Sequence, residues 1–295
     1  MEEKVQILMS TYNGERYLTE QLYSLLNQED VHVDILIRDD GSTDHTVNII
    51  RDFMQHYSNI HVYLGDNLGF AKSFWNLVSN AGNAEYYAFC DQDDIWLPDK
   101  IKCGITALKK CDNHQPLLYT SNVICVNQDN ELLDMHPFQG EVLDIYSAFQ
   151  KSILPGCTFI FNQSSLNLYK LYQGPLYAHD WAAYIITTAF GKVIYDSNGH
   201  IHYRLHGDNA IGAKTSLQFI KEKLRNLVEK NDCIRSRFAN AFYDTYCNRI
   251  DDHLLKRNIY DLGHYQLDKK AKARLLFRDN FHGIVFKTYV VINKV

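Results

Sequence analysis

The fold is decided by residues 5–91, which contain four apolar runs of strand length: VQILMSTY (5–12), VDILIRDD (33–40), IHVYL (60–64) and EYYAFCD (85–91). Segments between these runs carry apolar side chains at helical spacing, first Leu18, Leu22, Leu25 and Leu26, then Val47, Ile50, Phe53 and Met54. Strands that alternate with helices predict an α/β fold with a parallel sheet covered by helices. Because ligands of such sheets bind at the carboxyl ends of the strands, we expect function near positions 10–15, 38–44 and 66–72.

The composition predicts a folded protein without general affinity for nucleic acid. The chain has 295 residues, of which 46% are hydrophobic, so it can bury a sizeable core. It carries 30 Lys and Arg against 35 Asp and Glu, a formal net charge of -5. A protein that binds nucleic acid without specificity needs an excess of positive charge to displace the counterions of the phosphates. We therefore expect no nucleic acid among the partners.

Three features predict a cytoplasmic location. The first residues, MEEKVQILMS, have two acids where a signal peptide carries its basic segment. No window contains about 18 consecutive apolar residues, the length that spans a membrane. The seven cysteines are odd in number and form no CxxC pair, so we expect reduced thiols rather than a disulfide framework or a zinc ribbon.

A change of composition divides the chain near residue 212. All five prolines lie in the first 175 residues, and from about 213 onward the apolar residues have helical spacing. These apolar positions are Leu217, Ile220, Leu224, Leu227 and Val228. The sequence therefore predicts a main domain over 1–212 and a helical C-terminal region over 213–295.

A group of carboxylates directly follows the fourth apolar run. Asp91, Asp93 and Asp94 come after YYAFC, with Gln92 between the first two. Carboxylates this close together repel one another unless a cation neutralises them, and their hard oxygen atoms suit Mg²⁺ or Mn²⁺. Such an ion can in turn bind a diphosphate. The alternative is an acidic turn that caps a helix beginning near Pro98.

Four segments follow one another in the first half of the chain: STYNGERYL (10–18), IRDDGSTDHT (37–46), DNLGFAKSFW (66–75) and FCDQDDIWLPDKI (89–101). In this order they resemble the nucleotide-binding half of the family-2 inverting glycosyltransferases, and CDQDDIW is similar to the bacterial rhamnosyltransferase-like branch. The resemblance implies a GT-A-type, Rossmann-like fold for nucleotide-diphospho-sugars, followed by the helical region. It makes 1–212 the catalytic domain, with a donor-binding half over about 1–115 and an acceptor half over about 116–212.

The first two segments are expected to bind the base and the ribose of the donor. Thr11 and Tyr12 close the first strand, where a backbone edge and an aromatic face can hold a pyrimidine. Glu15 can reach a ribose hydroxyl or cap the next helix. Asp40 can accept the pyrimidine N–H, with Asp39 as its near substitute, although both carboxylates can instead be simple helix caps.

The next two segments are expected to reach the phosphates. Asn67, Gly69 and Lys72 lie at a strand-to-helix turn, where Lys72 can meet the base carbonyl or a phosphate; family members often carry Arg here. By the same resemblance, Asp91 faces the ribose and Asp93 coordinates the Mn²⁺ or Mg²⁺ that bridges the two phosphates. Trp96 is interpreted as a packing residue rather than a platform for sugar.

Two later segments are expected to form the acceptor side. PGCTFIFN (155–162) resembles the family's glycine-containing strand, and YAHDWAAYIITTAFG (177–191) resembles its acidic motif at a helix start. An inverting transfer needs a base opposite the leaving diphosphate, and Asp180 is the predicted base. The alternative for Asp180 is a helix cap. His179 is adjacent and can titrate, but the resemblance favours the carboxylate.

The segment HIHYRLHGDNAIG (200–212) has two interpretations. Its spacing allows a zinc site of His200, His202 and His206, although no cysteine accompanies them. Its resemblance to the YRxHGxN segment of rhamnosyltransferase-like enzymes instead assigns Arg204 and His206 to the donor diphosphate and His206 also to the metal. Nitrogen donors there would stabilise the leaving diphosphate.

The C-terminal tail, residues 269–295, carries seven basic side chains and one acid, with apolar residues between them. Such a segment can lie on an anionic membrane surface. The alternative is an ordinary amphipathic helix packed on the catalytic domain. The predicted location is therefore the cytoplasm, with peripheral attachment to the inner face of the cell membrane as one alternative.

Together these residues predict a metal-dependent, inverting glycosyltransferase. We expect it to move L-rhamnose from dTDP-rhamnose to a growing cell-surface glycan, such as a capsule, an O-antigen or a cell-wall polysaccharide, with a lipid-linked glycan as one form of acceptor. The alternatives are the same enzyme type with UDP-glucose or UDP-galactose, a sugar nucleotidyltransferase, and a non-catalytic glycan-binding module. A nucleotidyltransferase needs a Gly-rich, basic loop after the first strand, which STYNGERYL lacks. The joint presence of Asp91, Asp93 and Asp180 argues against the non-catalytic module.

Overall fold

The structure is a computed structural model that describes residues 3–134, 144–151, 154–205, 233–277, 281 and 284–291. The chain forms two compact units. The first comprises Met1–Val142, Ile153–Lys170 and Ala178–His206, and the second comprises Leu143–Ser152, Leu171–Tyr177 and Gly207–Val295. The predicted boundary at 212 lies outside the described residues and stays a prediction.

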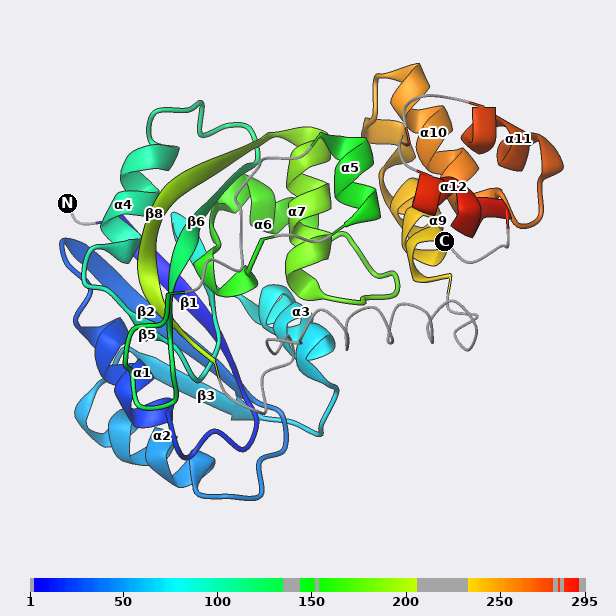
Figure 1. Ribbon diagram of the computed structural model, residues 1–295. Coiled ribbons are helices and arrows are strands. Elements are labelled where there is room, and N and C mark those ends of the chain that lie inside the picture. Colours follow the sequence, from blue (N-terminus) through cyan, green and yellow to red (C-terminus); the bar gives the residue numbers. More distant parts are fainter. Residues whose placement is uncertain are drawn as a thin grey trace. The chain divides into compact units, whose positions relative to one another are not determined.

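The first unit is built on one mixed sheet of eight strands (Figure 1). They are β1 (Glu3–Thr11), β2 (Val31–Asp39), β3 (Ile60–Leu64), β4 (Tyr86–Cys90), β5 (Ile95–Trp96), β6 (Leu117–Val126), β7 (Ile160–Asn162) and β8 (Lys192–Arg204), in the order β3-β2-β1-β4-β7-β6-β8-β5. Strands β1 to β4 pair in parallel, as predicted. Strand β7 is antiparallel to β4 and β6, and the short β5 is antiparallel to β8.

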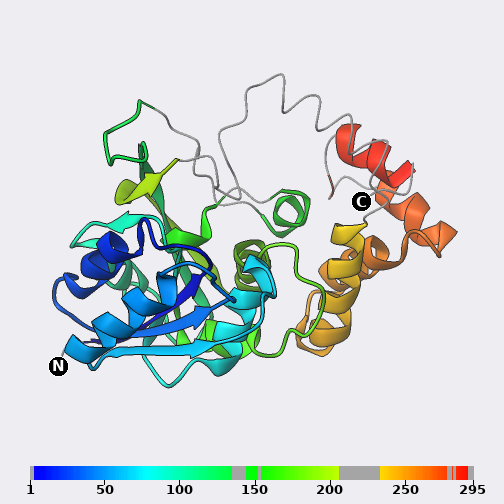
Figure 2. The ribbon, with the colours of Figure 1, turned by 90° about the horizontal axis from the view of Figure 1, so that it is seen from below.

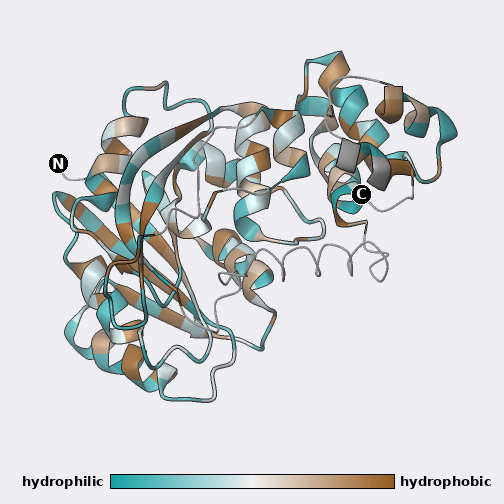
Figure 3. Ribbon diagram, in the orientation of Figure 1, coloured by the Kyte–Doolittle hydropathy of each residue, from teal (hydrophilic) through white to brown (hydrophobic). Residues whose placement is uncertain are grey.

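Helices pack on both faces of this sheet. They are α1 (Leu18–Leu26), α2 (Thr46–His56), α3 (Phe70–Asn80), α4 (Lys100–Leu108), α6 (Gln163–Tyr169) and α7 (His179–Phe190). Side chains of α1, α2 and α4 share one core cluster with the strands. Aromatic rings of α3 and α6 meet rings of the strands: Phe74 of α3 meets Phe89 of β4, and Tyr169 of α6 meets Phe161 of β7. The strands of the sheet are accordingly rich in apolar residues (Figure 3).

The predicted helical stripes match the structure except at one position. Leu18, Leu22 and Leu25 of α1 are buried, and so are Ile50 and Phe53 of α2. Met54 is 38% exposed, because the helix turns its side chain away from the sheet. Trp96 is buried as a packing residue, with the Lys100 ammonium 3.3 Å from the centroid of its ring.

The second unit contains the helices α5 (Ile145–Gln150), α9 (Ile234–Tyr246), α10 (His253–His264), α11 (Lys269–Phe277) and α12 (Ile284–Val291). Helix α9 contacts α10, α10 contacts α11, and α11 contacts α12 (Figure 2). Two short segments of the predicted catalytic domain belong to this unit because of aromatic packing. Phe149 of α5 lies 5.6 Å from Phe242, and Tyr172 lies 5.0 Å from Phe238, measured between ring centroids.

The basic tail is partly packed into the second unit. Ala271, Leu275, Phe281, Phe286 and Val290 are buried there, whereas Phe277 is 86% exposed. The described apolar residues of the tail are thus packed mostly within the second unit, and packing on the catalytic domain stays a prediction. In the part of the chain that the structure describes, no helix is both long enough and apolar enough to span a bilayer.

Asp261 and Arg274 form a buried ion pair between α10 and α11. The carboxylate is fully buried and accepts hydrogen bonds from Nε of Arg274 at 2.7 Å and from its terminal nitrogen at 2.5 Å. We expect Arg274→Leu to lower the free energy of unfolding of this unit by about 3 kcal/mol, because the carboxylate stays buried without its counter-charge.

Chemical denaturation measures this loss. Arg257→Leu, at an exposed position of α10, is the matched control and should leave the midpoint near that of the wild type. Equal midpoints for the two variants would contradict the structural role of the pair.

Candidate functional site

The candidate site lies at the carboxyl ends of β1, β2 and β4, where the predicted segments come together. These strands pair in parallel, so their ends meet at the same edge of the sheet. Residues 11 and 39 are register partners at this edge, and the amide of Asp40 donates to the carbonyl of Thr11 at 2.8 Å. The edge carries the acidic residues that the sequence singled out.

The carboxylate of Asp39 is taken up by hydrogen bonds from the turn that follows it and from Thr11. Its carboxylate accepts hydrogen bonds from Thr11 Oγ1 at 2.9 Å, from the amides of Gly41 and Ser42 at 3.2 and 2.8 Å, and from Ser42 Oγ at 2.6 Å. Four donors fill the acceptor positions of a carboxylate. Asp39 therefore stabilises its own turn and does not cap α2, whose N-cap residue is His45, so the helix-cap alternative for Asp39 is wrong.

Asp40 has a buried carboxylate that keeps one acceptor position. Oδ1 pairs with Arg38 and accepts from the amide of Leu68 at 2.8 Å, while Oδ2 accepts from the amide of Gly69 at 2.9 Å. No further hydrogen bond to Oδ2 occurs within the described ranges, and a carboxylate oxygen can accept two. Asp40 is thus better suited than Asp39 to accept a ligand N–H.

Arg38 is a site residue that the sequence analysis missed. It is 3% exposed, and besides Asp40 it donates to Ser73 Oγ at 2.9 Å and to the carbonyl of Asp66 at 2.9 Å. It therefore ties the end of β2 to the turn before α3. A lone arginine inside an apolar run carries no sequence signal for this role, because its partners lie about thirty residues away.

The turn after β1 is held by side chains from other segments. The amide of Tyr12 donates to Gln92 Oε1 at 2.8 Å, and Gln92 Nε2 donates to the carbonyl of Tyr12 at 2.9 Å. The ring of Tyr12 is 46% exposed and free to meet a ligand face. Glu15 accepts from the amide of His45, the residue before α2, at 2.9 Å, and makes no capping bond to α1, the helix that follows it in the chain.

Asn67, Gly69 and Lys72 are exposed at the start of α3. The amide of Gly69 also donates to Asn67 Oδ1 at 3.0 Å, and the φ angle of Gly69, 79°, is one that glycine adopts without strain. Lys72 lies in the first turn of the helix, with its side chain in solvent. The amide of Gly69 thus holds the turn through its bonds to Asp40 and Asn67, and the exposed Lys72 offers a positive charge beside it.

The acidic loop between β4 and β5 is held by Arg204. The amide of Arg204 donates to Asp94 Oδ1 at 3.1 Å, and its Nε donates to the carbonyl of Asp93 at 2.9 Å. Its terminal nitrogens donate to the carbonyl of Gln128 at 2.6 Å and to Glu20 at 2.7 Å. Arg204 is 2% exposed, so in this structure it positions the loop from behind.

The carboxylates of this loop have the electrostatics of a cation site. Burial, followed by the charges of Asp93 and Asp180, raises the pKa of Asp91 well above its usual value. The pKa of Asp94 is raised by burial and then by Asp93 and Asp91. Among the described residues, Asp94 Oδ2 is a buried atom without a hydrogen-bond partner of ordinary geometry. A bound cation would relieve this repulsion.

The donor atoms fit a hard divalent ion. Oxygens of Asp91 and Asp94 and the sulfur of Cys157 lie within 4.8 Å of one another, and Asp93 adds its carboxylate beside them. The sulfur of Cys157 is a single soft atom, 1% exposed, beside the hard carboxylate oxygens of Asp91 and Asp94. The carboxylate oxygens therefore suit Mg²⁺ or Mn²⁺ better than a thiophilic metal.

Asp180 lies in the first turn of α7, close enough to Asp91 to affect its ionisation. Burial raises the pKa of Asp180 to about 6, although hydrogen bonds from the amides of Trp181 and Gly156 oppose the shift. The Trp181 amide donates to Oδ1 at 2.7 Å. A carboxylate with this pKa is ionised at neutral pH and can accept a proton.

His179 is enclosed by aromatic rings and is a poor base. Its imidazole stacks on Phe74 with ring centroids 3.8 Å apart and meets the edge of Phe89 at 4.9 Å. Burial lowers the pKa of His179 to about 3, so the ring is neutral. Of the two neighbouring titratable groups, Asp180 is therefore the one that can act near neutral pH.

The histidine trio is only partly described. His200 Nδ1 faces Asp99 at 3.1 Å, whereas His202 Nδ1 faces Asn130 at 2.9 Å, so the two rings have different partners. His206, expected to hold the metal and the diphosphate, lies outside the described residues. The zinc site of three histidines therefore has no support among the residues described.

A sheet of this strand order, with an acidic loop at its carboxyl edge and a second acid beside it, defines a glycosyltransferase of the GT-A type. The chain belongs to Glycosyl transferase family 2, whose sequence profile matches residues 6–168. It is similar to the dTDP-rhamnosyl transferase RfbG of Shigella flexneri, with 34% identity over 287 residues, 90% of this chain and 96% of the relative. The predicted family and fold are confirmed.

Solved structures have the same fold at low identity. The crystal structure of S. aureus TarS 1-349 matches with a TM-score of 0.60 and 16% identity, over 99% of this chain and 78% of that one. The mannosyltransferase PcManGT from Pyrobaculum calidifontis, in complex with GDP-Man and Mn²⁺, matches with a TM-score of 0.51 and 14% identity, over 100% of this chain and 86% of that one. The roles predicted for individual site residues stay predictions.

Gly156 allows Asp180 to take its position. A Cβ atom at residue 156 would lie 2.8 Å from Cβ of Asp180 and 2.9 Å from Nε2 of His179. We expect Gly156→Ala to destabilise the protein by about 1–3 kcal/mol, because the buried neighbours must move, and to lower turnover by displacing Asp180.

Thermal unfolding and transfer assays on the same preparation check both effects. Gly82→Ala is the control, because its Cβ would meet only the side chain of Gln6, at 3.4 Å or more. If Gly156→Ala matched the wild type in stability and turnover, the close packing around Asp180 would not matter.

Proposed function

We propose that this glycosyltransferase moves L-rhamnose from dTDP-rhamnose to a growing cell-surface glycan, with inversion and with Mn²⁺ or Mg²⁺. The similarity to the Shigella enzyme, which extends over 90% of this chain, supports the donor. The mechanism rests on one observation: Asp180 lies close enough to the buried Asp91 of the acidic loop to raise the pKa of that carboxylate. A base and a diphosphate site that adjoin one another are what a single displacement needs.

Asp180 acts as the general base in this proposal. Its carboxylate takes the proton of the acceptor hydroxyl while the hydroxyl oxygen forms a bond to the anomeric carbon. The bond from that carbon to the diphosphate oxygen breaks, and its electron pair leaves with the nucleotide diphosphate. Because attack comes from the face opposite the leaving group, the configuration at the anomeric carbon inverts.

Asp93 would hold the metal, with Asp91 beside it toward the ribose. The ion, when bound, offsets the charge that develops on the leaving diphosphate. Lys72 is proposed to add a second positive charge on the other side of the donor. Arg204 acts through its bonds to the loop, and His206 is proposed as a further ligand by resemblance alone.

The base of the donor is proposed to bind between the ends of β1 and β2. The exposed ring of Tyr12 offers a face for stacking, and Oδ2 of Asp40 offers an acceptor for the N–H of a pyrimidine. Thymine and uracil both present this N–H. This N–H therefore does not distinguish dTDP-rhamnose from UDP-glucose or UDP-galactose, which differ from it in the transferred sugar, the 5-methyl group of the base and the 2′-hydroxyl of the ribose.

A donor panel tests the proposed function. The full chain is incubated with dTDP-rhamnose, UDP-glucose or UDP-galactose in the presence of Mn²⁺, and slow hydrolysis is followed by release of the nucleotide diphosphate. We expect the fastest release from dTDP-rhamnose. Faster release of the nucleotide diphosphate from a UDP-sugar would contradict dTDP-rhamnose as the donor but would leave the proposed mechanism unaffected.

Contact of the tail with an anionic membrane is proposed only for its exposed apolar residues. Phe277, at the end of the basic helix α11, is 86% exposed, and Val291 of α12 is 56% exposed. Apolar and basic residues on one helix are typical of binding to an anionic lipid surface. Such contact would bring the enzyme to a lipid-linked acceptor.

Asp180→Asn tests the base. The change keeps size and capping ability but removes proton acceptance, so turnover should fall by about 10²–10⁴-fold while donor binding is retained. In the wild type, the base works only when unprotonated, so turnover should fall as the pH drops below about 6, near the raised pKa of Asp180.

Turnover across this pH range, beside donor binding by calorimetry, is the measurement. An Asn variant with normal turnover would move the role of base to another acid. A wild-type profile that stays flat down to pH 4 would contradict the raised pKa.

Removal of the metal tests the acidic loop. We expect EDTA to abolish transfer and Mn²⁺ or Mg²⁺ alone to restore it, because the leaving diphosphate otherwise lacks its counter-charge. Asp93→Ala should stay inactive after the same addition. Gln128→Ala, which removes no carbonyl or carboxylate from the loop, is the control. Near-normal turnover of Asp93→Ala with Mn²⁺ would withdraw Asp93 as the metal ligand.

A further inference from the structure

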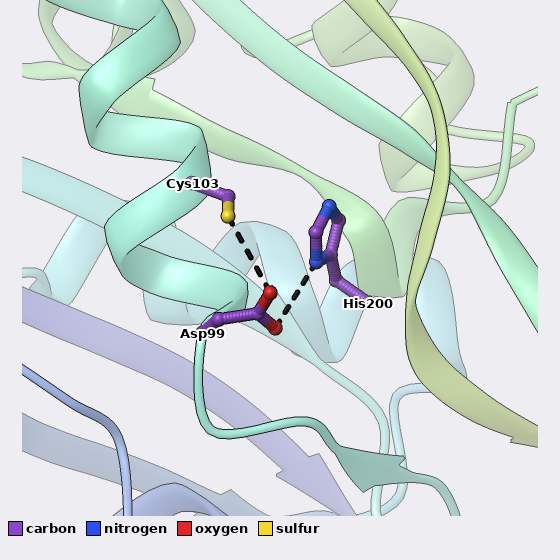
Figure 4. A group of neighbouring side chains, drawn as sticks. All are labelled: Asp99, Cys103 and His200. Atoms are coloured by element: carbon purple, nitrogen blue, oxygen red, sulfur yellow. Dashed lines mark hydrogen bonds and ion pairs between the residues drawn. The ribbon is translucent and has the colours of Figure 1, made fainter.

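A second group of metal-binding side chains lies away from the acidic loop, between α4 and β8. Asp99, Cys103 and His200 each offer one ligand atom, and these atoms lie within 4.8 Å of one another. The carboxylate of Asp99 stands between the thiol and the imidazole (Figure 4). One oxygen lies 3.6 Å from Sγ of Cys103, and the other lies 3.1 Å from Nδ1 of His200.

The carboxylate of Asp99 is directed to this group instead of capping its helix. Asp99 is the N-cap residue of α4, a position where aspartate ordinarily accepts a hydrogen bond from the amides of the first turn. No such side-chain bond is present at this helix start. Cys103 follows four residues later, so the two side chains lie on the same face of the helix.

His200 is fixed opposite them by the sheet. Its carbonyl accepts from the amide of Leu97 at 3.0 Å, next to the pairing of β5 with β8. Its second ring nitrogen, Nε2, lies 3.4 Å from Oδ2 of Asp196 without the geometry of a hydrogen bond, and this oxygen accepts from the hydroxyl of Tyr119 at 3.1 Å. A carboxylate behind an imidazole is the usual means of orienting a histidine that binds a metal through its other nitrogen.

The distances suit a tetrahedral ion of intermediate softness. Zinc bonds of about 2.3 Å to sulfur and about 2.0–2.1 Å to nitrogen and oxygen separate the ligand atoms by about 3.3–3.5 Å. Sγ of Cys103 and Nδ1 of His200 lie 3.6 and 3.1 Å from the two different oxygens of Asp99, and one ligand atom from each residue lies within 4.8 Å of the others. A rotation of the Asp99 carboxylate would bring one oxygen into the ligand set with both. A set of one sulfur, one nitrogen and one oxygen favours zinc over the magnesium or manganese expected at the acidic loop. The side chain of Asp99 is 47% exposed, which leaves a path of entry and room for water as the fourth ligand.

We propose that Asp99, Cys103 and His200 form a zinc site, oriented by Asp196, that joins the start of α4 to β8. The site is separate from the metal of the proposed transfer reaction. It lies near the acidic loop along the chain: Asp99 follows β5, the strand after the loop, and His200 precedes Arg204, which bonds to the loop, on β8. Zinc there would stabilise the loop from outside, without contact with the donor.

Cobalt is the probe for this site. The full chain, freed of metal by a chelator, is titrated with Co²⁺ in excess Mg²⁺, which occupies oxygen-ligand sites. We expect a sulfur-to-cobalt charge-transfer band in the near ultraviolet that saturates at one ion per chain and disappears when Zn²⁺ is added. Asp196→Asn should weaken binding by about 10–100-fold and keep the band at saturation, since it removes only the group behind the imidazole.

Matched variants identify the ligands. Cys103→Ser should abolish the band, whereas Cys111→Ser, a free thiol three residues beyond α4, should retain it. Asp99→Asn should weaken cobalt binding, and because this side chain is half exposed, thermal unfolding without metal should match the wild type. Asp93→Ala should leave the band unchanged, which separates this site from the proposed active site.

The proposal is overturned if the wild type gives no thiolate band, if Cys103→Ser keeps it, or if Asp93→Ala removes it. None of these readouts depends on transferase activity. A failure of the proposed donor or mechanism would therefore leave this test unaffected, and the converse also holds.

Discussion

One buried guanidinium, that of Arg204, joins three segments that are far apart in the sequence. It donates to the carbonyl of Asp93 in the acidic loop, to the carbonyl of Gln128 and to Glu20 on α1, while the backbone amide of Arg204 donates to Asp94. The loop it holds contains carboxylates that repel one another, as the raised pKa of Asp91 indicates. A fixed positive charge and several directed hydrogen bonds offset that repulsion and keep the loop in one conformation. The geometry of the candidate site depends on this contact.

The sequence predicted the first half of the sheet well, because each of its strands and helices can be recognised from a short stretch of residues. Strands β1 to β4 alternate with helices, and each parallel pairing follows from the next apolar run. The second half is different: β7 is antiparallel between two parallel neighbours, and β8 pairs with β6 across an irregular register. Such pairings depend on contacts across many residues, which periodicity does not encode. For the same reason, no local pattern predicted that segments 143–152 and 171–177 belong to the helical unit, where aromatic residues of both segments are packed.

Candidate site residues could be predicted where the type of side chain and its place at the end of a strand or helix indicate the chemistry. Carboxylates after a buried strand pointed to Asp91 and Asp93, and a carboxylate at a helix start pointed to Asp180. Protonation behaviour was not predictable, because it comes from burial. His179 has the residue type of a base, but the ring of Phe74 and its neighbours keep it neutral. Asp99 carried no signal either, since in sequence it is only a residue after a proline.

The double hydrogen bond between Gln92 and the backbone of Tyr12 has a consequence for which substitutions the loop can tolerate. The bond needs one acceptor and one donor at the end of a side chain of this length. Glutamate has the length but no donor when ionised, and asparagine has both groups but is one methylene shorter. Gln92 lies between Asp91 and Asp93, and no other common amino acid offers an acceptor and a donor at the end of a side chain of the same length. Substitution of Gln92 is therefore restricted by its two hydrogen bonds to the backbone of Tyr12, independently of any ligand that the aspartates bind.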